Sequence, residues 1–584
     1  MKRNLPNRSL REMVNRASRL LTISRILLAL SALWLPEKTF GVGHWTSVAT
    51  NVADNLGLIM LLSDGTVLAE GSNSNWWKLT PDSTGHYVNG ALTPRQSSNW
   101  GHQTGSSAVL TNGNVYVAGG ENGNGSSKVE IYNPVTGLWS VAINPTYFGS
   151  IQDGNAMVMP DGRVLVEPQG ESEEYSGDTF LFNPGNNTFS QTTNAPLMGL
   201  GEASWVKLPN DNVLVIDSGG CGGSTNAYMY IPSAEIWTNA VTGGTLPNIW
   251  PNMCGTCNSN GCIVSEEGPA FLLPNGNAIF FGGAGLTAVY SNGIWSQSAS
   301  LPGTLGQKDA PGAMLVNGRV LLAVSPQGDN SSASDANGIG PTSFYEYTYT
   351  ANNGAGAFTN APNPASLSGA AAACNLLDLP DGTVLLSVQT GQLYVYQPDG
   401  SPLAAGQPTI YSVQWNANGS LHLTGTLFNG ISQGAAFGDD AQMDSNWPLV
   451  RFTSGSTVLY GYTYNWSSTS VQTGGRIVTT EVTVPPAVLN FPGQWSLQVV
   501  ANGIASAGVT FYSPVWVNFS YYSAQGYYFG FSNYPYSTLA DGVANVRSGG
   551  TIAIESSSTV SDEALTITNA MNIISVGGPS TVGN

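Results

Sequence analysis

Acidic residues recur at one fixed distance from a repeated turn. Asp153, Glu202, Glu267 and Asp309 each lie nine residues before the last turn residue of a short phrase, which is a glycine in three cases and an aspartate in the fourth. Carboxylates can ligate Ca²⁺, accept hydrogen bonds from sugar hydroxyls, or act as an acid and base pair. Four of them at one structural level would repel each other unless a cation or hydrogen-bond donors intervene. We expect them to form an acidic arc and a candidate ligand-binding site.

The phrase that sets this spacing recurs seven times. It consists of an apolar residue, a spacer, a turn pair of Asn, Asp or Gly type, one further residue and an apolar run. Asp-Gly and Asn-Gly between apolar runs favour a tight turn with both central residues at positive φ, so each phrase predicts a β-hairpin. The phrases begin at Leu62, Leu110, Met159, Leu208, Leu273, Leu315 and Leu379.

The hairpins predict a ring of seven blades. Most intervals between them are near fifty residues, the period of kelch-type propeller blades, and several are followed by a second hairpin, such as the one starting at Tyr132. Residues 44–405 are therefore predicted to form a seven-bladed β-propeller. The HWTSV segment at 44–48 resembles the outer-strand ends of the blades, and we expect it to complete the last blade and close the ring.

Two smaller β-regions follow, which makes the predicted fold class all-β. Longer alternating strands over residues 406–517 predict an immunoglobulin-like β-sandwich. Residues 518–584 hold a short helix candidate and brief β-rungs. This β-helix-like tail resembles the start of a pectate-lyase-type parallel β-helix.

The N-terminus and the charge predict export. Eight of the 18 basic residues lie before position 39, and the apolar run from Ile26 is shaped like a signal-peptide core. We predict a signal peptide over residues 1–43, a secreted or cell-surface location, and no stable membrane span after cleavage. The net charge of −18 disfavours nucleic acid as a partner.

The predicted propeller and sandwich resemble the galactose oxidase and kelch superfamily with its early-set immunoglobulin-like domain. Besides the seven phrases, the likeness rests on QPTIYSV from Gln407, the VRF run at Val450 and the FPGQWSLQVVANGIAS segment from Phe491.

That resemblance implies a copper site made by two histidines and two tyrosines, one tyrosine being cross-linked to a cysteine. Thr104 stands at the matching radical-tyrosine position, Ala372 and Ala373 at the Tyr-His pair, and the sandwich-loop histidine falls close to Tyr464. With these ligands replaced, we do not expect copper or radical oxidation.

The arc should open onto further acidic loops. Glu171, Glu173 and Glu174 lie in one loop between second and third strands, on the same predicted face. Such a face suits Ca²⁺, a cationic ligand or sugar hydroxyls. A structural alternative is that the carboxylates accept backbone N–H bonds from the adjacent blade and only stabilise the ring.

The sequence also contains five cysteines, several aromatic residues near predicted loops, and one further acidic loop. Two disulfides are predicted in an exported chain, with a four-thiolate zinc site as the alternative, and Cys374 is predicted to be a buried thiol. Trp76, Trp77, Trp100 and Tyr175 could stack on sugar rings, although blade packing is the simpler interpretation. Asp439, Asp440 and Asp444 are expected in a solvated sandwich loop. The disulfide candidates are Cys221, Cys254, Cys257 and Cys262.

The sequence favours an exported, non-redox propeller that binds carbohydrate or another extracellular polymer through the acidic face. The first alternative is a carbohydrate-active enzyme, either a hydrolase or lyase using the arc or an atypical galactose-oxidase-like oxidoreductase. The second alternative is a structural cell-surface module whose tail docks a cell-surface partner. Whether the protein is an enzyme stays open at this point.

Overall fold

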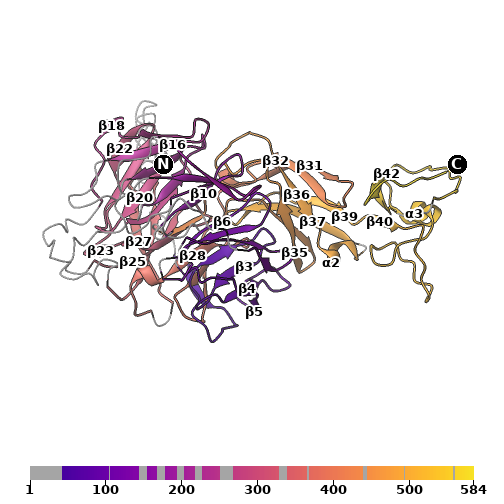
Figure 1. Cartoon of the computed structure of the whole chain (residues 1–584), viewed down its shortest axis with the longest axis horizontal. Helices are drawn as coiled ribbons and strands as arrows, with labels where there is room; N and C mark the ends of the chain where they lie inside the picture. Colours follow the sequence, from indigo (N-terminus) through magenta and orange to yellow (C-terminus); the bar gives the residue numbers. More distant parts are fainter. Residues whose placement is uncertain are drawn as a thin grey trace, which may run out of the picture. The chain divides into compact units, whose positions relative to one another are not determined.

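The computed structural model describes residues 42–583, apart from 104, 121, 126, 142, 144–150, 152–153, 168–177, 194–202, 217–225, 250–266, 328–338, 365–366, 438–443, 492 and 557–559. Within this part, seven antiparallel blades are followed by a larger sheet and a short parallel sheet. Figure 1 shows the order by colour, with blades from indigo to salmon, the larger sheet in orange and the parallel sheet in yellow.

Each blade places its first strand innermost. The first blade contains β2 (Ile59–Leu61), β3 (Val67–Glu70), β4 (Trp76–Thr80) and β5 (Ala91–Arg95), and the second contains β6 (Ser106–Val109), β7 (Val115–Ala118), β8 (Val129–Asn133) and β9 (Leu138–Trp139). The third blade contains β10 (Ala156–Val158), β11 (Val164–Val166), β12 (Phe180–Asn183) and β13 (Thr188–Gln191). The fourth blade contains β14 (Trp205–Lys207), β15 (Val213–Ile216), β16 (Ala227–Ile231) and β17 (Ile236–Asn239).

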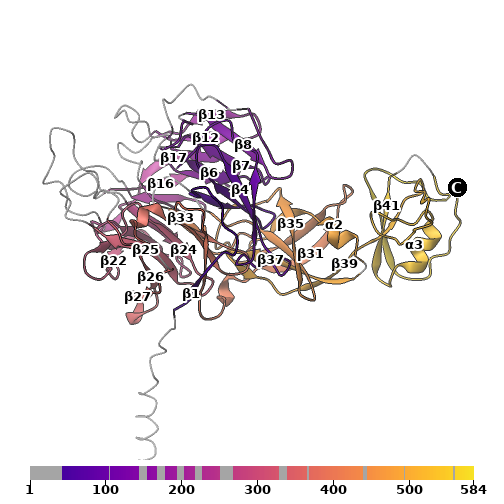
Figure 2. The same ribbon diagram turned by 90° about the horizontal axis from the view of Figure 1, so that it is seen from below.

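The last three blades carry small additions. The fifth blade contains β19 (Glu267–Leu272), β20 (Ala278–Gly282), β21 (Thr287–Ser291) and β22 (Ile294–Gln297), with β18 (Gly243–Gly244) added at its edge. The sixth blade contains β24 (Pro311–Met314), β25 (Val320–Pro326), β26 (Ser343–Thr348) and β27 (Ala357–Ala361), and β23 (Leu305–Gly306) pairs with β25. The seventh blade contains β28 (Asn375–Asp378), β29 (Val384–Ser387), β30 (Tyr394–Gln397) and β1 (His44–Ser47). Figure 2 shows several of these strands from below.

The ring closes as predicted. Strand β1 pairs antiparallel with β30, with His44 opposite Gln397. The Trp45 ring packs 4.9 Å from that of Tyr396 and 4.8 Å from that of Phe344. The N-terminal strand therefore covers the free edge of the seventh blade, which joins the two ends of the ring.

The seven repeated turns form hairpins, but their geometry differs from the prediction. In the first, the Leu62 N–H donates to the Thr66 carbonyl (2.7 Å) and the Gly65 N–H donates to the Leu62 carbonyl (3.0 Å). Gly65 has a φ of 75°, whereas Asp64 is not left-handed. This is a three-residue loop with one left-handed position, so the expected turn with two positive φ values is wrong.

The residue before the glycine has a different role. The Asp64 carboxylate accepts a hydrogen bond from the Thr66 N–H (3.0 Å), two residues further on. Asn and Asp side chains fix turns in this way, which explains their recurrence in all seven phrases. The equivalent donors are the backbone N–H groups of Asn114, Arg163, Asn212, Asn277, Arg319 and Thr383.

The larger sheet folds around one apolar core and forms the predicted sandwich. It contains β31 (Thr409–Trp415), β32 (Leu421–Thr426), β34 (Leu449–Ser454), β35 (Thr457–Tyr464), β36 (Val478–Thr483), β37 (Gln494–Ala501), β38 (Ile504–Ala505) and β39 (Val509–Tyr512). Leu423, Phe452, Val482 and Leu497 are buried together in this core. The sandwich contacts the repeated hairpins: the Tyr462 hydroxyl donates to the Asn112 carbonyl at 2.8 Å.

One sandwich segment enters the propeller channel. Strand β33 (Ala435–Phe437), between β32 and β34, pairs with β24, the innermost strand of the sixth blade. Gln433 Oε1 accepts a hydrogen bond from the Lys207 N–H at 2.8 Å, and Lys207 Nζ donates to the Val158 carbonyl (2.6 Å) and the Thr469 carbonyl (3.1 Å). Sandwich residues therefore bond to the innermost strands of the third, fourth and sixth blades.

The tail contains the predicted helix and parallel rungs. Strands β40 (Val515–Val517), β41 (Gly550–Glu555) and β42 (Met571–Val576) pair in parallel. Helix α3 (Leu539–Asn545) begins after Thr538, whose hydroxyl accepts a hydrogen bond from the Asp541 N–H at 3.1 Å. Among the described residues, no helix is long and apolar enough to cross a membrane.

Candidate functional site

A polar groove lies between the first and second blades. Its volume is about 240 Å³, and amide groups dominate its lining. The segment before β6 contributes to it, so it lies at the same end of the innermost strands as Glu267, the first residue of β19. It therefore opens on the face for which the acidic arc was predicted. The lining residues are Asn73, Ser74, Asn99, Gly101, Gln103, Asn122, Gly123 and Asn124.

Backbone hydrogen bonds fix the floor of the groove. The Gly101 carbonyl accepts from the N–H groups of Asn124 (3.1 Å) and Gly125 (2.8 Å), and Asn124 Oδ1 accepts from the Gly101 N–H (2.7 Å). A Cβ added at Gly123 would lie 2.3 Å from the Gly101 carbonyl oxygen, so only glycine allows this approach. Residues 123–125 of the β7–β8 loop thus pack closely against Gly101.

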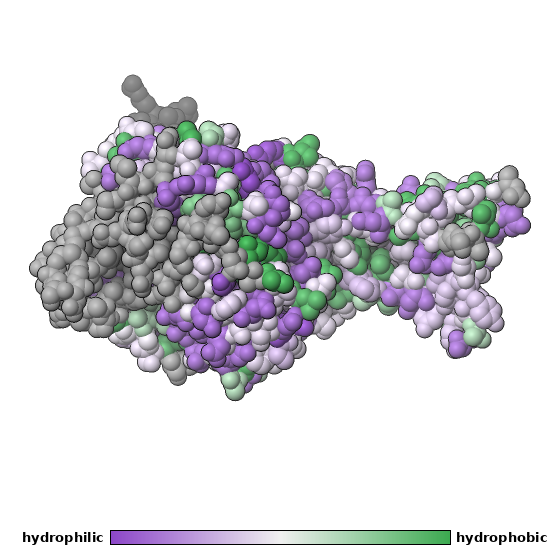
Figure 3. Space-filling model, in the orientation of Figure 1, coloured by the Kyte–Doolittle hydropathy of each residue, from purple (hydrophilic) through white to green (hydrophobic). Residues whose placement is uncertain are grey.

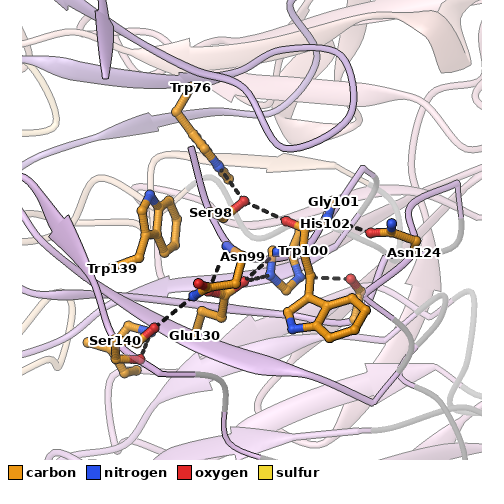
Figure 4. A network of polar contacts seen from close by, with 12 residues as sticks. Trp76, Ser98, Asn99, Trp100, Gly101, His102, Asn124, Glu130, Trp139 and Ser140 are labelled. Atoms are coloured by element: carbon orange, nitrogen blue, oxygen red, sulfur yellow. Dashed lines mark hydrogen bonds and ion pairs between the residues drawn. The ribbon is translucent and has the colours of Figure 1, made fainter. Parts of the chain in front are cut away.

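A buried carboxylate anchors the blade-connecting segment that forms one wall. Glu130, on β8, is fully buried and accepts hydrogen bonds from the N–H groups of Asn99 (3.0 Å) and Trp100 (3.1 Å), as well as from the Asn99 side-chain amide. Figure 4 shows these contacts converging on the Glu130 side chain. Burial raises the pKa of Glu130, but hydrogen bonds from His102 and Asn99 outweigh it, so the pKa is lowered overall.

His102 completes this network. Its Nδ1 faces the Gly119 carbonyl at 2.9 Å and its Nε2 faces Glu130 Oε2 at 2.9 Å. A carbonyl can only accept, so Nδ1 carries a proton. Nε2 lies within hydrogen-bond distance of the Glu130 carboxylate. Neither side chain has exposed surface, which suits the pair to positioning Asn99 rather than to contact with a ligand.

A second buried carboxyl lies beside His102. Glu70, the last residue of β3, is 2% exposed. Burial raises its pKa to about 8, partly offset by a hydrogen bond from the His102 backbone. Glu70 is therefore predominantly protonated at neutral pH, and the space beneath the groove carries little net charge.

The tryptophans expected near the loops divide into packing and groove residues. Trp76 is buried, its Nε1 donates to Ser98 Oγ at 3.0 Å, and its ring lies 5.0 Å from that of Trp139. Trp77 donates to Asp54 at 2.9 Å. Trp100, between two groove residues, is half-buried with Lys128 Nζ 5.3 Å from its ring centre. Trp76 therefore has the packing role.

The structure describes two members of the predicted acidic arc. Glu267 is 1% exposed, and its Oε2 accepts a hydrogen bond from the Ser204 N–H of the fourth blade at 3.1 Å. The Asp309 N–H donates to the Glu267 carbonyl at 2.9 Å, which places these two residues side by side. Glu267 thus makes the bond to the adjacent blade that the structural alternative expects. Asp153, Glu202, Glu171, Glu173, Glu174 and Tyr175 lie outside the described residues.

The channel loop corrects one expectation. Asp444 Oδ1 is buried, and burial raises its pKa to about 7 while the charge of Lys207 lowers it. Asp444 is half-buried, with Oδ1 shielded from solvent, and so differs from the solvated position predicted for it, whereas Asp439 and Asp440 lie outside the described residues. Tyr464, near which the resemblance places the sandwich-loop histidine, is the last residue of β35, and its ring stacks on that of Tyr462. The sandwich segment that enters the channel is a different one, which carries β33.

Of the five cysteines, Cys374 lies within the described residues. Cys374 is a free, buried thiol, as predicted, and burial raises its pKa to about 12. Cys221, Cys254, Cys257 and Cys262 lie outside the described residues, as does Thr104. The part of the chain that the structure describes contains no cluster of three His, Cys, Asp or Glu residues able to hold a metal ion.

Sequence reasoning missed the groove and the His102–Glu130 pair. Asn and Gly are common in turns, so the GGENGNG loop starting at Gly119 carried no special signal. The 28-residue separation of His102 and Glu130 gave no motif either. The available clue was a glutamate, Glu130, between two apolar residues of β8, Val129 and Ile131.

Comparisons with known proteins agree with the sheets seen here. A profile of the Kelch motif matches residues 104–142, which include the second blade and the groove residues Asn122, Gly123 and Asn124. No curated protein sequence matches the chain. Among solved structures, a fungal alcohol oxidase of the AA5 family in complex with copper is 12% identical, with a TM-score of 0.43, covering 82% of this chain and all of that one.

A second solved structure, YCF48 bound to D1 peptide, is 12% identical, with a TM-score of 0.39, covering 63% of this chain and 99% of that one. The assignment of the fold rests on the described sheets and on the matched motif. This chain is a seven-bladed β-propeller with a kelch motif in its second blade, followed by an immunoglobulin-like sandwich and a short parallel β-tail.

Proposed function

We propose that this protein is an exported, non-redox propeller that binds carbohydrate through the groove between its first and second blades. The observation that carries the proposal is the lining: the described residues supply side-chain amides, a hydroxyl and glycine, and none of these described residues is charged. An amide side chain carries both donors and an acceptor, which match sugar hydroxyls. Within the protein, the Asn99 amino group already donates to Glu130 and Ser140, and Asn124 Oδ1 already accepts from Gly101, so the remaining amide atoms would meet the ligand. An uncharged polyhydroxylated ligand therefore matches the groove better than an ion does.

The groove also meets two physical conditions for such a site. Its volume of about 240 Å³ is near the lower end of ligand pockets, which suits a single sugar unit of a longer chain. Glu130 and the glycine-rich loop hold the lining backbone in place before binding, so less conformational entropy is lost when the ligand arrives. The predicted acidic arc, on the same face, would contact neighbouring sugar units or Ca²⁺.

The test is a glycan array run with and without Ca²⁺, followed by product analysis of every hit. We expect retention of a glycan without product. Turnover would instead support the carbohydrate-active enzyme, and the absence of any glycan hit would contradict the proposal and leave the structural module as the better account.

Asn73 offers a clean variant for this array. It is exposed in the groove with a φ of 62°, so Asn73→Gly removes the amide while keeping a backbone that glycine adopts freely. Losing one or two hydrogen bonds of about 1 kcal/mol each should weaken binding about five- to thirtyfold. Asn187, exposed in the third blade with a φ of 58°, is the matched control, and Asn187→Gly should bind as the wild type does.

A further inference from the structure

Two exposed aromatic rings and one half-buried ring form a row in the tail. Tyr527, Phe529 and Phe531 alternate along the chain, and their ring centres are 5.7 Å and 5.9 Å apart in sequence order. Tyr527 is 48% exposed and Phe529 is 50% exposed. The planes of these two rings differ by 19°. We call these three side chains the aromatic ladder.

The intervening residues point elsewhere. The Tyr528 hydroxyl accepts a hydrogen bond from the Ser523 N–H at 3.2 Å, and its ring packs edge-on against Tyr521, 5.8 Å away. Gly530 has no side chain, and its carbonyl accepts from the Trp516 N–H at 2.9 Å. Gly530 has a φ of 73°, so the chain bends there and is not an extended strand, and the row is defined by the distances between its ring centres.

The ladder stands on a fixed backbone. The Tyr534 carbonyl accepts hydrogen bonds from the N–H groups of Phe529 and Gly530, both at 2.9 Å. The Tyr534 ring lies edge-on to Phe529 at 5.9 Å and to Tyr527 at 6.3 Å. Ser532 donates to Asn490 Oδ1 at 2.6 Å, which ties the turn to the end of helix α2 (Pro486–Leu489). The rings are thus held before any partner arrives, which reduces the entropic cost of binding.

The surroundings select the kind of partner. The sequence has no charged residue between Glu481 and Asp541, so electrostatic attraction to nucleic acid or to anionic lipid has no source in this segment. Residues 518–537 contain no Leu, Ile, Val or Met, which are the usual aliphatic contacts of protein interfaces and membrane-surface helices. The same stretch contains Ser, Asn, Gln and Tyr residues, whose hydroxyls and amides can bond to sugar hydroxyls.

We propose that the aromatic ladder binds an uncharged polysaccharide chain, with successive sugar rings stacked on successive aromatic rings. The C–H face of a pyranose is apolar and flat, so it covers an aromatic face, while its equatorial hydroxyls reach polar groups at the side. A regular row of rings requires a ligand that repeats along its length, which a polysaccharide does. This surface is separate from the groove between the blades and does not depend on the function proposed for it.

Affinity electrophoresis tests the proposal with the full chain. Native gels containing hydroxyethylcellulose, galactomannan or laminarin, all soluble and neutral, should retard the protein in at least one case. Tyr527→Ala combined with Phe529→Ala should raise the apparent Kd at least tenfold, whereas Tyr527→Phe should bind as the wild type does. Tyr522→Ala is the matched control, because Tyr522 is 81% exposed in the same segment.

The outcomes separate this proposal from others. Loss of retardation in the double variant, with retention in Tyr522→Ala, supports it, and retention in Asn73→Gly shows that the groove is not responsible. No retardation by any of the three polysaccharides overturns it, as does unchanged retardation of the double variant. Binding to phosphatidylcholine vesicles or self-association through the same rings, without polysaccharide binding, also overturns it.

Discussion

Replacing Glu130 with glutamine tests the account of how the groove is held. Glu130 Oε2 accepts from Trp100 N–H and His102 Nε2, and Oε1 accepts from Asn99 N–H. An amide in either orientation presents its NH₂ to one of the two backbone donors, which leaves a buried N–H without a partner at about 1–3 kcal/mol. Loss of charge assistance in the remaining bonds adds about 1 kcal/mol. We expect Glu130→Gln to lower the free energy of unfolding by about 3 kcal/mol at pH 7.

The pH dependence follows from the lowered pKa of Glu130. The group is ionised more readily in the folded protein than at its ordinary value of 4.5, so its stabilisation is complete above that value. It is lost as the pH falls through the lower folded-state pKa. The difference between wild type and Glu130→Gln should therefore shrink in strong acid.

Urea denaturation followed by tryptophan fluorescence at pH 7 and pH 3 measures both effects. Glu235→Gln is the control, because Glu235 is 47% exposed in an ion pair with Arg163 and should change stability by less than about 1 kcal/mol. A Glu130→Gln protein as stable as the wild type at pH 7 would refute the reasoning.

Three further predictions concern other parts of the molecule. Gly113→Ala should lower the melting temperature more than Gly137→Ala does. Both glycines have a positive φ, 81° and 72°, but a Cβ added at Gly113 would lie 2.3 Å from the Tyr462 hydroxyl, whereas one added at Gly137 would have nothing within 4 Å. Equal shifts in thermal melts would contradict the contact between hairpin and sandwich. Burial lowers the pKa of Lys207 from 10.5 to about 8, so the unfolded chain holds that proton more tightly and stability should rise between pH 8 and 10.5. Urea denaturation should show that Lys207→Met removes this rise, and an unchanged profile would argue against a buried ammonium. Cys374 should resist iodoacetamide in the folded protein at pH 8, as peptide mass mapping would show, and the four other cysteines should yield disulfide-linked peptides; free thiols with bound zinc would contradict the second expectation.

The blades were predictable because their signals are local. Each phrase combines a turn glycine such as Gly65 with apolar runs, and the spacing of successive phrases is that of one blade. The closing strand β1 was predictable for the same reason, since Trp45 repeats an outer-strand pattern. The turn type was missed because Asp64 and its equivalents serve through side-chain hydrogen bonds and not through positive φ.

The groove and the channel segment depend on contacts distant in sequence. Asn99 meets Glu130 across 31 residues, and Lys207 meets Thr469 across 262 residues, so no local pattern announces either contact. Asp444 looked like a loop residue because its sequence neighbours are polar, yet the pairing of β33 with β24 carries its segment into the propeller. Among the coloured atoms in Figure 3, apolar groups lie in small separate patches in that view of the molecule.

The most direct test of carbohydrate binding by the groove is hydrogen–deuterium exchange with a glycan identified on the array. Binding in the groove should slow exchange in peptides that contain residues 73–74, 99–103 and 122–125, and Asn73→Gly should weaken that protection. Protection confined to other blades, or a bound glycan that leaves these three segments unchanged, would contradict the proposed site.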